Sequence, residues 1–434
     1  MKARPNRADG VTMNHFEFKD GLLHAEDVPV TTIAKDIGTP FYCYSTATLL
    51  RHYDVFSSAF ADIDAMVCYA MKANSNQAVL KTLADRGAGA DVVSGGELLR
   101  ALRVGIDPKK IMFSGVGKTI AEIDMAIASG IFCFNIESEN ELELISARAV
   151  DAGLTAHVSF RINPDVDAKT HAKISTGRKS DKFGIAYDRA ESIYARAREL
   201  PGVEVTGIDM HIGSQIIDLK PFDEAFDRLA TLVHRLRAAG HEISHIDLGG
   251  GLGVPYKNAD ATPPEPHAYA EIVKRHVRDL GAKIVFEPGR MIVANAGILV
   301  ARVLYVKKDE GKTFVIVDAA MNDLIRPTLY EAWHEIQPVE RAANRKTITA
   351  DIVGPICESG DFLGKDREIV EVAEGDLVFL SSAGAYGAVQ SSTYNSRPLI
   401  AETLVKGGEY AVIRERQTID ELIGLDHIPE WLDA

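Results

Sequence analysis

The sequence predicts an α/β protein in which a (β/α)8 TIM barrel is joined to a C-terminal β-rich domain of barrel-like or sandwich-like form. Three observations support this prediction. Short, apolar, β-rich runs alternate with longer helical patterns from about residue 45 to 290, these runs number eight, and only strand-like runs follow Pro288. Eight strand–helix units over roughly 250 residues are typical of this barrel. A doubly wound open sheet would show the same alternation, but the number of units favours the barrel.

The predicted barrel strands are runs rich in apolar and β-forming residues. They are Met66–Ala70, Gly89–Val93, Ile111–Phe113, Ile131–Asn135, Thr155–Ile162, Val205–His211, His245–Leu248 and Lys283–Glu287. Amphipathic stretches with apolar residues at helical spacing precede or separate them. Examples are Ser45–Phe60, Glu139–Ala152, Phe222–Ala239 and His267–Leu280.

Four segments follow from these patterns. Residues 1–15 are predicted to be disordered, 16–40 to join the β-rich domain with Phe16–Thr32 extended, 41–290 to form the barrel, and 291–434 to form the β-rich domain. The predicted strands of the last segment are Ile298–Val306, Thr313–Asp318, Thr347–Val353, Glu368–Val372 and Leu377–Ser381. One long polar break in the barrel, Asn163–Lys182, predicts a functional or mobile loop.

Bulk composition excludes several partners. The net charge of −14 and a pI near 5.4 argue against binding to nucleic acid or an anionic membrane. No run approaches the ~18 apolar residues of a membrane span, and the first ten residues lack the apolar core of an export signal. The four cysteines show no Cys-x-x-Cys spacing, so neither disulfides nor a metal site is expected. A cytoplasmic protein in a reducing compartment is therefore predicted.

Polar and glycine-rich residues follow several predicted strands, where a TIM barrel carries its functional groups. Lys72 follows the first strand, Asp91 ends the second and Arg161 ends the fifth. The last three strands run into His211-Ile-Gly-Ser-Gln, Gly249-Gly-Gly-Leu-Gly and Glu287-Pro-Gly-Arg. These groups are therefore expected to gather at one rim of the barrel.

The glycines after the seventh and eighth strands suggest a phosphate site. Gly249 to Gly251, with Gly289 next door, would let backbone N–H groups approach an anion closely, although tight turns explain them equally well. Their spacing is not the Gly-x-Gly-x-x-Gly of dinucleotide-binding proteins.

Lys72 on the same rim suggests a Schiff base. A lysine partly removed from water has a lowered pKa and can react with an aldehyde, although an ordinary rim charge is the commoner role. A phosphate site and a Schiff-base lysine together indicate pyridoxal 5′-phosphate (PLP). Glu287 could then keep the pyridine nitrogen protonated and His211 could stack on the ring, unless it is a simple hydrogen-bonded rim histidine.

Four motifs resemble those of the PLP decarboxylases with the alanine-racemase-like fold. They are Tyr69-Ala-Met-Lys-Ala-Asn74, His211-Ile-Gly-Ser-Gln215, Asp247-Leu-Gly-Gly-Gly-Leu-Gly253 and Glu287-Pro-Gly-Arg290. The resemblance covers the chain from about Phe16 onward. It implies that Lys72 forms the aldimine with PLP, that His211 stacks on the ring and that Glu287 contacts the pyridine nitrogen. It also implies a phosphate site and cofactor contacts made by Ser214, Gly250, Gly251, Gly289, Arg290 and Tyr386, with Asp91 and Arg161 beside the cofactor or in a structural ion pair.

Motifs in the C-terminal domain are similar to those of the diaminopimelate decarboxylases. They are Arg326-Pro-Thr-Leu-Tyr330, Gly354-Pro-Ile-Cys-Glu-Ser-Gly-Asp361 and Ala383-Gly-Ala-Tyr-Gly387. The set suits a substrate that is an amino acid at both ends, because Arg290 and Arg326 can grip a carboxylate and Glu358 can pair with an ammonium group. Tyr330 and Tyr386 can add hydroxyl contacts. The resemblance implies conversion of meso-2,6-diaminopimelate to L-lysine and CO2, the last step of lysine biosynthesis.

Cys357 differs from the other cysteines, because it lies in a loop-like sequence while Cys43, Cys68 and Cys133 lie in apolar runs. The resemblance implies that Cys357 protonates the carbanion left by CO2. It also implies that the loop carrying Cys357 reaches into the barrel of a second copy, so that the active sites are shared in a homodimer.

Three other functions remain open. A same-fold decarboxylase could act on ornithine, arginine or carboxynorspermidine, although Arg326 and Glu358 favour diaminopimelate. A non-catalytic PLP-binding homologue would be expected to lack Lys72 or Cys357. A racemase would need a catalytic tyrosine, and Tyr386 could serve.

Overall fold

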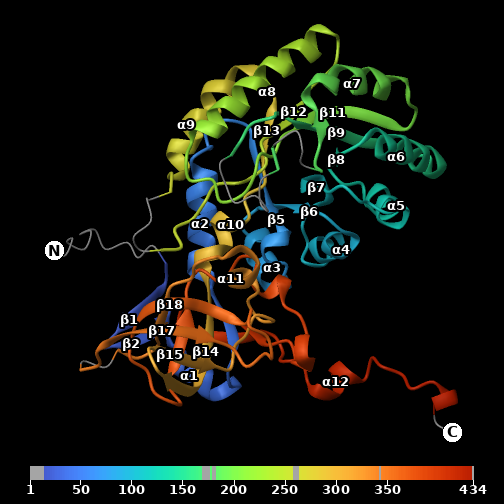
Figure 1. Cartoon of the computed structure of the whole chain (residues 1–434). Helices are drawn as coiled ribbons and strands as arrows, with labels where there is room; N and C mark the ends of the chain where they lie inside the picture. The colour runs from blue at the N-terminus through green and yellow to red at the C-terminus, as the bar shows by residue number, and fades with distance from the viewer. Residues whose placement is uncertain (1–13, 169–175, 178–181, 258–262, 342–343, 433–434) are drawn as a thin grey trace.

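The computed structural model describes residues 14–168, 176–177, 182–257, 263–341 and 344–432. A helix-covered barrel and a β-rich part are arranged end to end (Figure 1). Most of the predicted disordered segment 1–15, and much of the predicted loop Asn163–Lys182, lie outside the described residues. Within the described residues, no helix is both long enough and apolar enough to cross a lipid bilayer.

The predicted TIM barrel is confirmed as a closed ring of eight parallel strands. Each strand pairs with the next along the chain, β8 pairs with β9, and β13 pairs with β5 to close the ring. The strands are β5 (Ala65–Ala70), β6 (Gly89–Val92), β7 (Ile111–Phe113), β8 (Cys133–Ile136), β9 (Ala156–Asn163), β11 (Val203–Asp209), β12 (His245–Asp247) and β13 (Lys283–Phe286). A short strand, β10 (Ile185–Ala186), adds to the outside of β9.

Helices cover the outside of the barrel. They are α2 (Thr46–Ser58), α3 (Gln77–Ala84), α4 (Gly95–Arg103), α5 (Ile120–Ser129), α6 (Glu139–Ala152), α7 (Ala190–Glu199), α8 (Lys220–Ala238) and α9 (Pro266–Val277). Local sequence explains their starts, since the side chains of Ser94, Thr119 and Ser138 accept N-terminal backbone hydrogen bonds of α4, α5 and α6. In α8 the residues Phe222, Ala225, Phe226, Leu229, Leu232, Val233 and Leu236 are buried at helical spacing.

The β-rich part is built on one long strand, β14 (Gly297–Asp309), which pairs with three different neighbours. Its largest sheet runs in the order β18-β17-β15-β14-β4-β20-β21. The members are β4 (Phe41–Ser45), β15 (Lys312–Val317), β17 (Thr347–Val353), β18 (Phe362–Val370), β20 (Ala401–Lys406) and β21 (Glu409–Arg414), with β16 (Ile336–Pro338) and β19 (Leu377–Leu380) joined at β14. The helices of this part are α1 (Val30–Ile37), α11 (Arg326–Tyr330) and α12 (Ile419–Ile423).

The N-terminal segment forms a small sheet of its own, β1 (Phe16–Lys19), β2 (Leu22–Ala25) and β3 (Val28–Pro29). It packs against the β-rich part, where the Leu23 N–H donates to the Val339 carbonyl oxygen at 2.8 Å. The prediction of an extended Phe16–Thr32 needs correction at its end, because α1 begins at Val30.

One predicted boundary differs from the structure. The prediction began the barrel at residue 41, but β4 pairs antiparallel with β14 and parallel with β20 and so lies in the β-rich sheet. All five residues of β4 are buried, which gives a continuous apolar run that local sequence cannot assign to either part. The strands β20 and β21 were not predicted.

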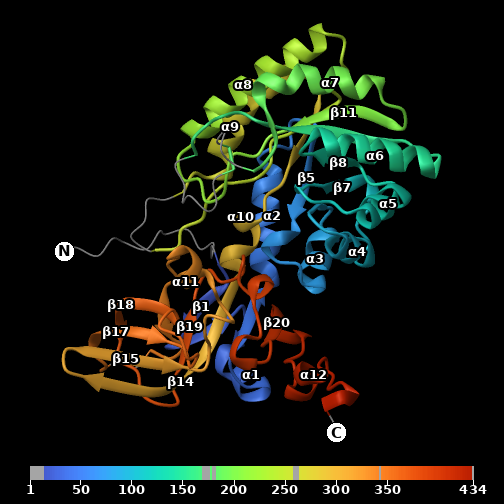
Figure 2. The same ribbon diagram turned by 45° about the vertical axis from the view of Figure 1, so that its right-hand side comes forward.

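The two parts of the chain meet beside Lys72. Tyr386 donates its backbone N–H to the Ala73 carbonyl oxygen at 2.7 Å, and the Asn74 side chain donates to the Gly384 carbonyl oxygen at 3.1 Å. A short helix, α10 (Arg290–Val293), leads from the barrel rim toward β14 (Figure 2). The loops of the β-rich part therefore form one wall of whatever site lies at the barrel rim.

Candidate active site

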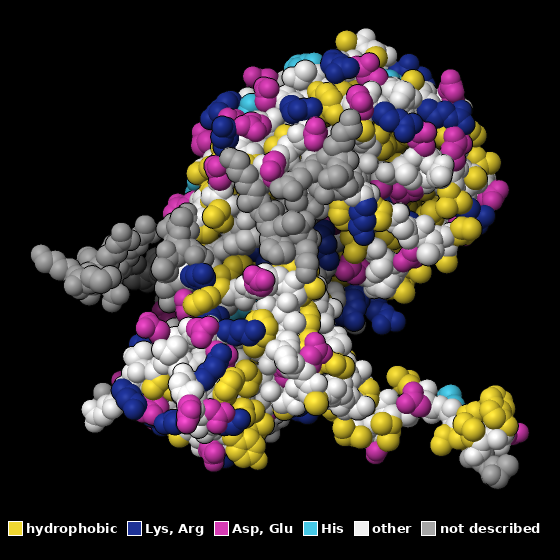
Figure 3. Space-filling view, viewed as in Figure 1, with side chains coloured by type: hydrophobic (Ala, Val, Ile, Leu, Met, Phe, Trp, Pro, Cys, Tyr) yellow, Lys and Arg dark blue, Asp and Glu magenta, His cyan; other side chains and the backbone are white. Residues whose placement is uncertain are grey.

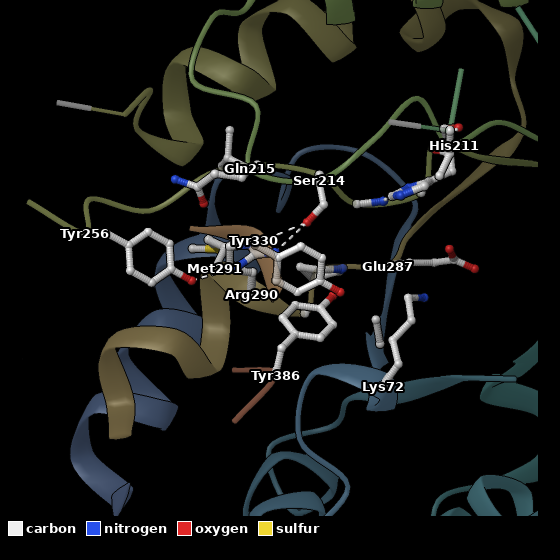
Figure 4. A pocket seen from close by; sticks show the side chains of 18 of the residues that line it. Lys72, His211, Ser214, Gln215, Tyr256, Glu287, Arg290, Met291, Tyr330 and Tyr386 are labelled. Atoms are coloured by element: carbon white, nitrogen blue, oxygen red, sulfur yellow. Dashed lines mark hydrogen bonds between the residues drawn. The ribbon is translucent and has the colours of Figure 1, made fainter. Parts of the chain in front are cut away.

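A cavity of about 320 Å³ opens between the rim of the barrel and the β-rich part. Its lining includes Lys72, His211, Ser214, Gly250, Gly251, Glu287, Gly289, Arg290, Arg326, Tyr330 and Tyr386, all predicted from the sequence. Figure 4 shows Lys72 and Glu287 near one end of the cavity, below His211, with Tyr256 at the opposite end and Arg290 between. The cavity joins residues that are more than 300 positions apart in the chain.

Lys72 lies in a single turn directly after β5, and its side chain is 38% exposed. Its Nζ donates to Oδ2 of the fully buried Asp91 at 2.6 Å. Burial alone would lower the pKa of Lys72, but the carboxyl groups of Asp91 and Glu287 outweigh burial and hold this pKa above its ordinary value. The expectation of a lowered lysine pKa is therefore wrong for the protein without a bound cofactor, because it considered burial and not the neighbouring carboxylates.

Three buried carboxyl groups lie together near the lysine, at the ends of β11 and β12 and directly after β13. Oxygen atoms of Asp209, Asp247 and Glu287 lie within 4.8 Å of one another. Burial, reinforced by Asp247, raises the pKa of Glu287 and of Asp209 well above their ordinary values, and burial raises that of Asp247 to about 6. Glu287 and Asp209 therefore favour their protonated forms, and the three carboxyl groups could also offer oxygen ligands to a cation.

Neutral hydrogen-bond donors fix this cluster in place. Asn135 on β8 donates through Nδ2 to Asp247 Oδ2 and Glu287 Oε1, each at 3.4 Å. The Ser114 hydroxyl lies 3.4 Å from the same Glu287 oxygen, and Ser159 donates to the Asn135 side-chain oxygen. The floor of the barrel is thus a polar network that sets the direction of the Glu287 carboxyl group.

Arg161 pairs with Glu137, which the sequence analysis did not single out. Nη1 of Arg161 lies 2.9 Å from Glu137 Oε1, and both side chains are nearly inaccessible to solvent. Glu137 also accepts backbone N–H bonds from Gly115 and Gly184. In this structure Arg161 thus has a structural ion pair, which was one of its two predicted roles, and it does not line the cavity.

His211 lies two residues beyond the end of β11, which corrects the prediction that it ends that strand. Its Nδ1 accepts the Gly250 N–H at 3.2 Å. Burial, reinforced by the charges of Arg161 and Lys72, holds the pKa of His211 well below its ordinary value, so the ring is neutral. A neutral ring held by the glycine loop has a fixed orientation over the cavity.

The glycines after β12 and β13 lie where side chains do not fit. A Cβ atom on Gly250 would lie 2.3 Å from the Glu287 carbonyl oxygen, and one on Gly251 would lie 2.5 Å from the Gly213 carbonyl oxygen. Gly251 also has a φ of 110°. These glycines therefore bring three barrel loops into backbone contact beside Ser214 and Arg290.

Two arginines from different parts of the chain line the cavity, Arg290 from the barrel and Arg326 from α11. Both are buried, at 7% and 5% exposure. The guanidinium group of Arg290 donates to the Ser214 hydroxyl and lies 4.7 Å from the centre of the Tyr386 ring. Tyr330 and Tyr386 line the same region.

Cys357 and Glu358 do not line this cavity within one chain. Both are exposed, and the Cys357 N–H donates to the Asn395 side-chain oxygen at 3.0 Å. Their loop packs behind α11, where Thr328 donates to the Gly360 carbonyl oxygen at 2.6 Å. Most of the predicted residues thus line the cavity, Cys357 and Glu358 lie on the surface, and Asp91 and Arg161 are buried outside the lining.

Several residues of the site were missed. Ser114, Asn135, Glu137 and Asp209 follow or end barrel strands, so the rule that led to Lys72 and Asp91 could have found them. Asp247 was quoted in a motif without a role. No sequence pattern marked Tyr256, Trp333 and His334, because they do not directly follow a barrel strand. They lie in loops and contact the cavity or its arginines.

The barrel matches a known family model. Residues 46–294 match the model described as "Pyridoxal-dependent decarboxylase, pyridoxal binding domain". Together with the cavity and its lysine, this match defines the class as the pyridoxal-dependent amino-acid decarboxylases.

Comparison with relatives that match nearly the whole chain identifies the family within this class. The chain is 50% identical over 418 residues to the diaminopimelate decarboxylase of Vibrio cholerae, covering 96% of this chain and 99% of the relative. It is 52% identical over 410 residues to that of Pseudomonas aeruginosa, covering 94% and 98%. The crystal structure of the M. jannaschii diaminopimelate decarboxylase in complex with L-lysine superposes with a TM-score of 0.92 at 38% identity, covering 97% of this chain and 99% of that one. The chain belongs to the diaminopimelate decarboxylase family.

Proposed function

We propose that this enzyme converts meso-2,6-diaminopimelate to L-lysine and CO2, with PLP attached at Lys72. The observation that carries the proposal is the pairing in one cavity of an amine, Lys72, with two buried arginines, Arg290 and Arg326, that form no ion pair with a carboxylate of the described residues. An amine suits an aldehyde cofactor, and the two guanidinium groups suit a substrate carboxylate.

The residues around Lys72 fit PLP chemically. Asp91 Oδ1 is buried without a hydrogen-bond partner, and the buried Glu287 can face a ring nitrogen. When bound, PLP supplies an electron sink for the bond that breaks. Glu287 would hold a proton at the ring nitrogen, with His211 over the ring and Asp91 beside Lys72, whereas Arg161 keeps its structural ion pair with Glu137. Ser214, Gly250, Gly251, Gly289 and Arg290 would hold the phosphate, with Tyr386 beside it.

The substrate contacts follow from the rest of the cavity. Arg290 and Arg326, with Tyr330 and Tyr386, would bind the end of the substrate that is not decarboxylated. Holding that end would fix which carboxylate lies near Lys72 and would orient the bond to be broken. The β-rich wall of the cavity limits the access of water to this region.

We further propose a homodimer in which Cys357 and Glu358 act in the partner's cavity. Their exposure, and their absence from the cavity of their own chain, support this. Cys357 would donate the proton that replaces CO2, and Glu358 would pair with the distal ammonium group. Four free cysteines agree with a reducing, cytoplasmic compartment.

CO2 release by the PLP-loaded protein tests this proposal. We expect release from meso-diaminopimelate and not from ornithine or arginine. We expect its loss, by at least ~10³-fold, in Lys72→Ala, as nucleophile removal does in other enzymes. The control is Lys81→Ala, which removes an exposed lysine outside the cavity. Release from ornithine or arginine instead would contradict the assignment of the arginines, and no release from any of the three would favour a non-catalytic PLP-binding protein.

A further inference from the structure

Arg290 and Arg326 carry two positive charges in one cavity, and their hydrogen-bond partners are unusual. Arg290 donates to the hydroxyl groups of Ser214 and Tyr256, and Arg326 donates to the ring of His334. None of these partners is a carboxylate. Buried arginines are ordinarily paired with an acid, so this arrangement leaves positive charge available to a ligand.

Tyr256 contacts both arginines at once. Its hydroxyl oxygen accepts a hydrogen bond from Arg290 Nη1 at 2.7 Å, and the guanidinium carbon of Arg326 lies 4.6 Å from the centre of its ring. Burial raises the pKa of the Tyr256 phenol, but the two guanidinium charges outweigh burial and hold this pKa below its ordinary value. Only 9% of Tyr256 is exposed, so it has little freedom to turn away.

His334 fixes Arg326 from the other side. Its Nδ1 lies 2.9 Å from the Ser381 carbonyl oxygen, which can only accept, so Nδ1 carries the proton. Burial, reinforced by the charge of Arg326, holds the pKa of His334 well below its ordinary value, and the ring is neutral. Its Nε2 is therefore a bare acceptor, 2.8 Å from Arg326 Nη1. The ring of His334 also meets that of Tyr256 edge-on, with centres 5.5 Å apart.

We propose that Tyr256 and His334 are positioning residues that orient Arg290 and Arg326 toward the carboxylate at the end of the substrate farthest from Lys72, and thereby set the preference for a substrate that carries one. This inference rests on the proposed function. Because a phenol and a neutral imidazole direct guanidinium groups without neutralising them as a carboxylate would, the positive charge remains for the substrate. Figure 4 shows Tyr256 beyond Arg290 on the side away from Lys72.

The place of Tyr256 in the chain adds a second consequence. It follows the glycine loop after β12, and Gln215 ties the same loop to the loop after β11 by two hydrogen bonds with Val254. Arg326 and His334, by contrast, belong to the β-rich part. Tyr256 therefore links the barrel loops around Lys72 to the arginine of the other part, which keeps the two ends of the substrate site at a fixed separation.

Competitive inhibition of the PLP-loaded enzyme by two ligands tests this proposal. L-Lysine carries the distal carboxylate, and 1,5-diaminopentane is the same molecule without it. In Tyr256→Phe we expect the inhibition constant of L-lysine and the KM for meso-diaminopimelate to rise about tenfold, equivalent to about 1.4 kcal/mol, with kcat changed less than about threefold. The inhibition constant of 1,5-diaminopentane should stay within about twofold of wild type, since it lacks the group that the arginines bind.

Two further comparisons separate positioning from simple structural damage. Tyr194 on α7 is another buried tyrosine, and its hydroxyl donates to the Gly207 carbonyl oxygen of β11 at 2.8 Å. Tyr194→Phe removes this hydroxyl and should leave both inhibition constants unchanged. His334→Leu should weaken L-lysine binding selectively, whereas His334→Gln, whose side-chain oxygen can accept from Arg326, should restore most of it.

The outcomes are distinguishable from a failure of the proposed function. If wild-type enzyme neither decarboxylates diaminopimelate nor binds L-lysine, the proposed function is wrong. If wild type does both, and Tyr256→Phe binds L-lysine as well as wild type or loses both ligands equally, the positioning role is wrong. If His334→Leu and His334→Gln lose L-lysine binding equally, His334 has no positioning role.

Discussion

The buried carboxyl groups near Lys72 illustrate how burial and charge act on single residues. Asp209, Asp247 and Glu287 end neighbouring strands of a closed barrel, so their side chains converge where there is little water. Each ionised member makes ionisation of the others less favourable. The group therefore keeps protons that exposed carboxyl groups would lose, which suits a role in holding a proton at a cofactor nitrogen.

Asp247 should make the stability of the cofactor-free protein depend on pH. Its pKa rises from 3.8 to about 6 on folding, so it stabilises the fold fully below about pH 4 and this contribution is lost as pH rises through 6. From that shift, on the order of 3 kcal/mol is at stake. Urea unfolding at pH 4.5 and about pH 7 should show a smaller loss of stability in Asp247→Asn than in wild type.

Asp85→Asn serves as the control for that measurement, because Asp85 is exposed and pairs with Lys81 on the helix surface. Its stability should follow the wild-type pH profile. Parallel profiles for wild type and Asp247→Asn would show that Asp247 does not titrate as described.

At the residue scale, the site residues that could be predicted from the sequence are those that directly follow a barrel strand. Lys72 and Glu287 were predicted because barrel geometry alone brings strand ends together. Tyr256 and His334 were not, because they lie in loops whose path depends on how the β-rich part docks. A single sequence carries no local pattern for that docking. The role of Arg161 was left open for a similar reason. A structural ion pair, which the structure shows with Glu137, and a contact with the cofactor were both compatible with the sequence.

Loops after β12 and β13 act together as one element of the site. Glu287 donates its N–H to the Gly249 carbonyl oxygen at 2.8 Å, and Gly250 packs directly on the Glu287 carbonyl group. The two loops can approach this closely only because Gly250 has no side chain where it meets the Glu287 carbonyl group. Any residue larger than glycine must separate them and displace His211, which accepts the Gly250 N–H.

Gly250→Ala should therefore weaken PLP binding by at least about tenfold, since its Cβ would lie 2.3 Å from a backbone oxygen that cannot move independently. A PLP titration followed by absorbance measures this. The matched control is Gly117→Ala on another rim loop, where no atom lies within 4 Å of the added Cβ. Wild-type affinity in Gly250→Ala would contradict the close contact of the two loops.

Elements with regular patterns were predicted well, and the wrong assignment of β4 has a physical cause. All eight barrel strands and the helices named from the sequence are present, with ends shifted by a few residues. In contrast, β4 was assigned to the barrel although it lies in the other sheet. Its partners β14 and β20 are about 250 and 360 positions further along the chain, and no local pattern reports such distant pairing.

At the scale of the whole molecule, the chain exposes groups that suit contact with a second copy. Cys357 and Glu358 lie on its surface, and the C-terminal end extends away from the β-rich part (Figure 1). Leu425, Ile428, Trp431 and Leu432 in that end are 68–80% exposed, and hydrophobic side chains gather there in the space-filling view (Figure 3). Monomeric proteins rarely expose so many large apolar residues in one segment.

The proposed sharing of active sites between two copies can be tested by mixing variants. Lys72→Ala and Cys357→Ala homodimers should each have little activity, because every cavity lacks one of the two residues. In a mixed dimer, one cavity combines both defects and the other has neither. After dissociation and reassembly of an equal mixture, half of the dimers are mixed, so about a quarter of wild-type activity should return. Activity that stays at the level of the separate variants, in a mixture shown by labelled subunits to contain mixed dimers, would place Cys357 in the cavity of its own chain.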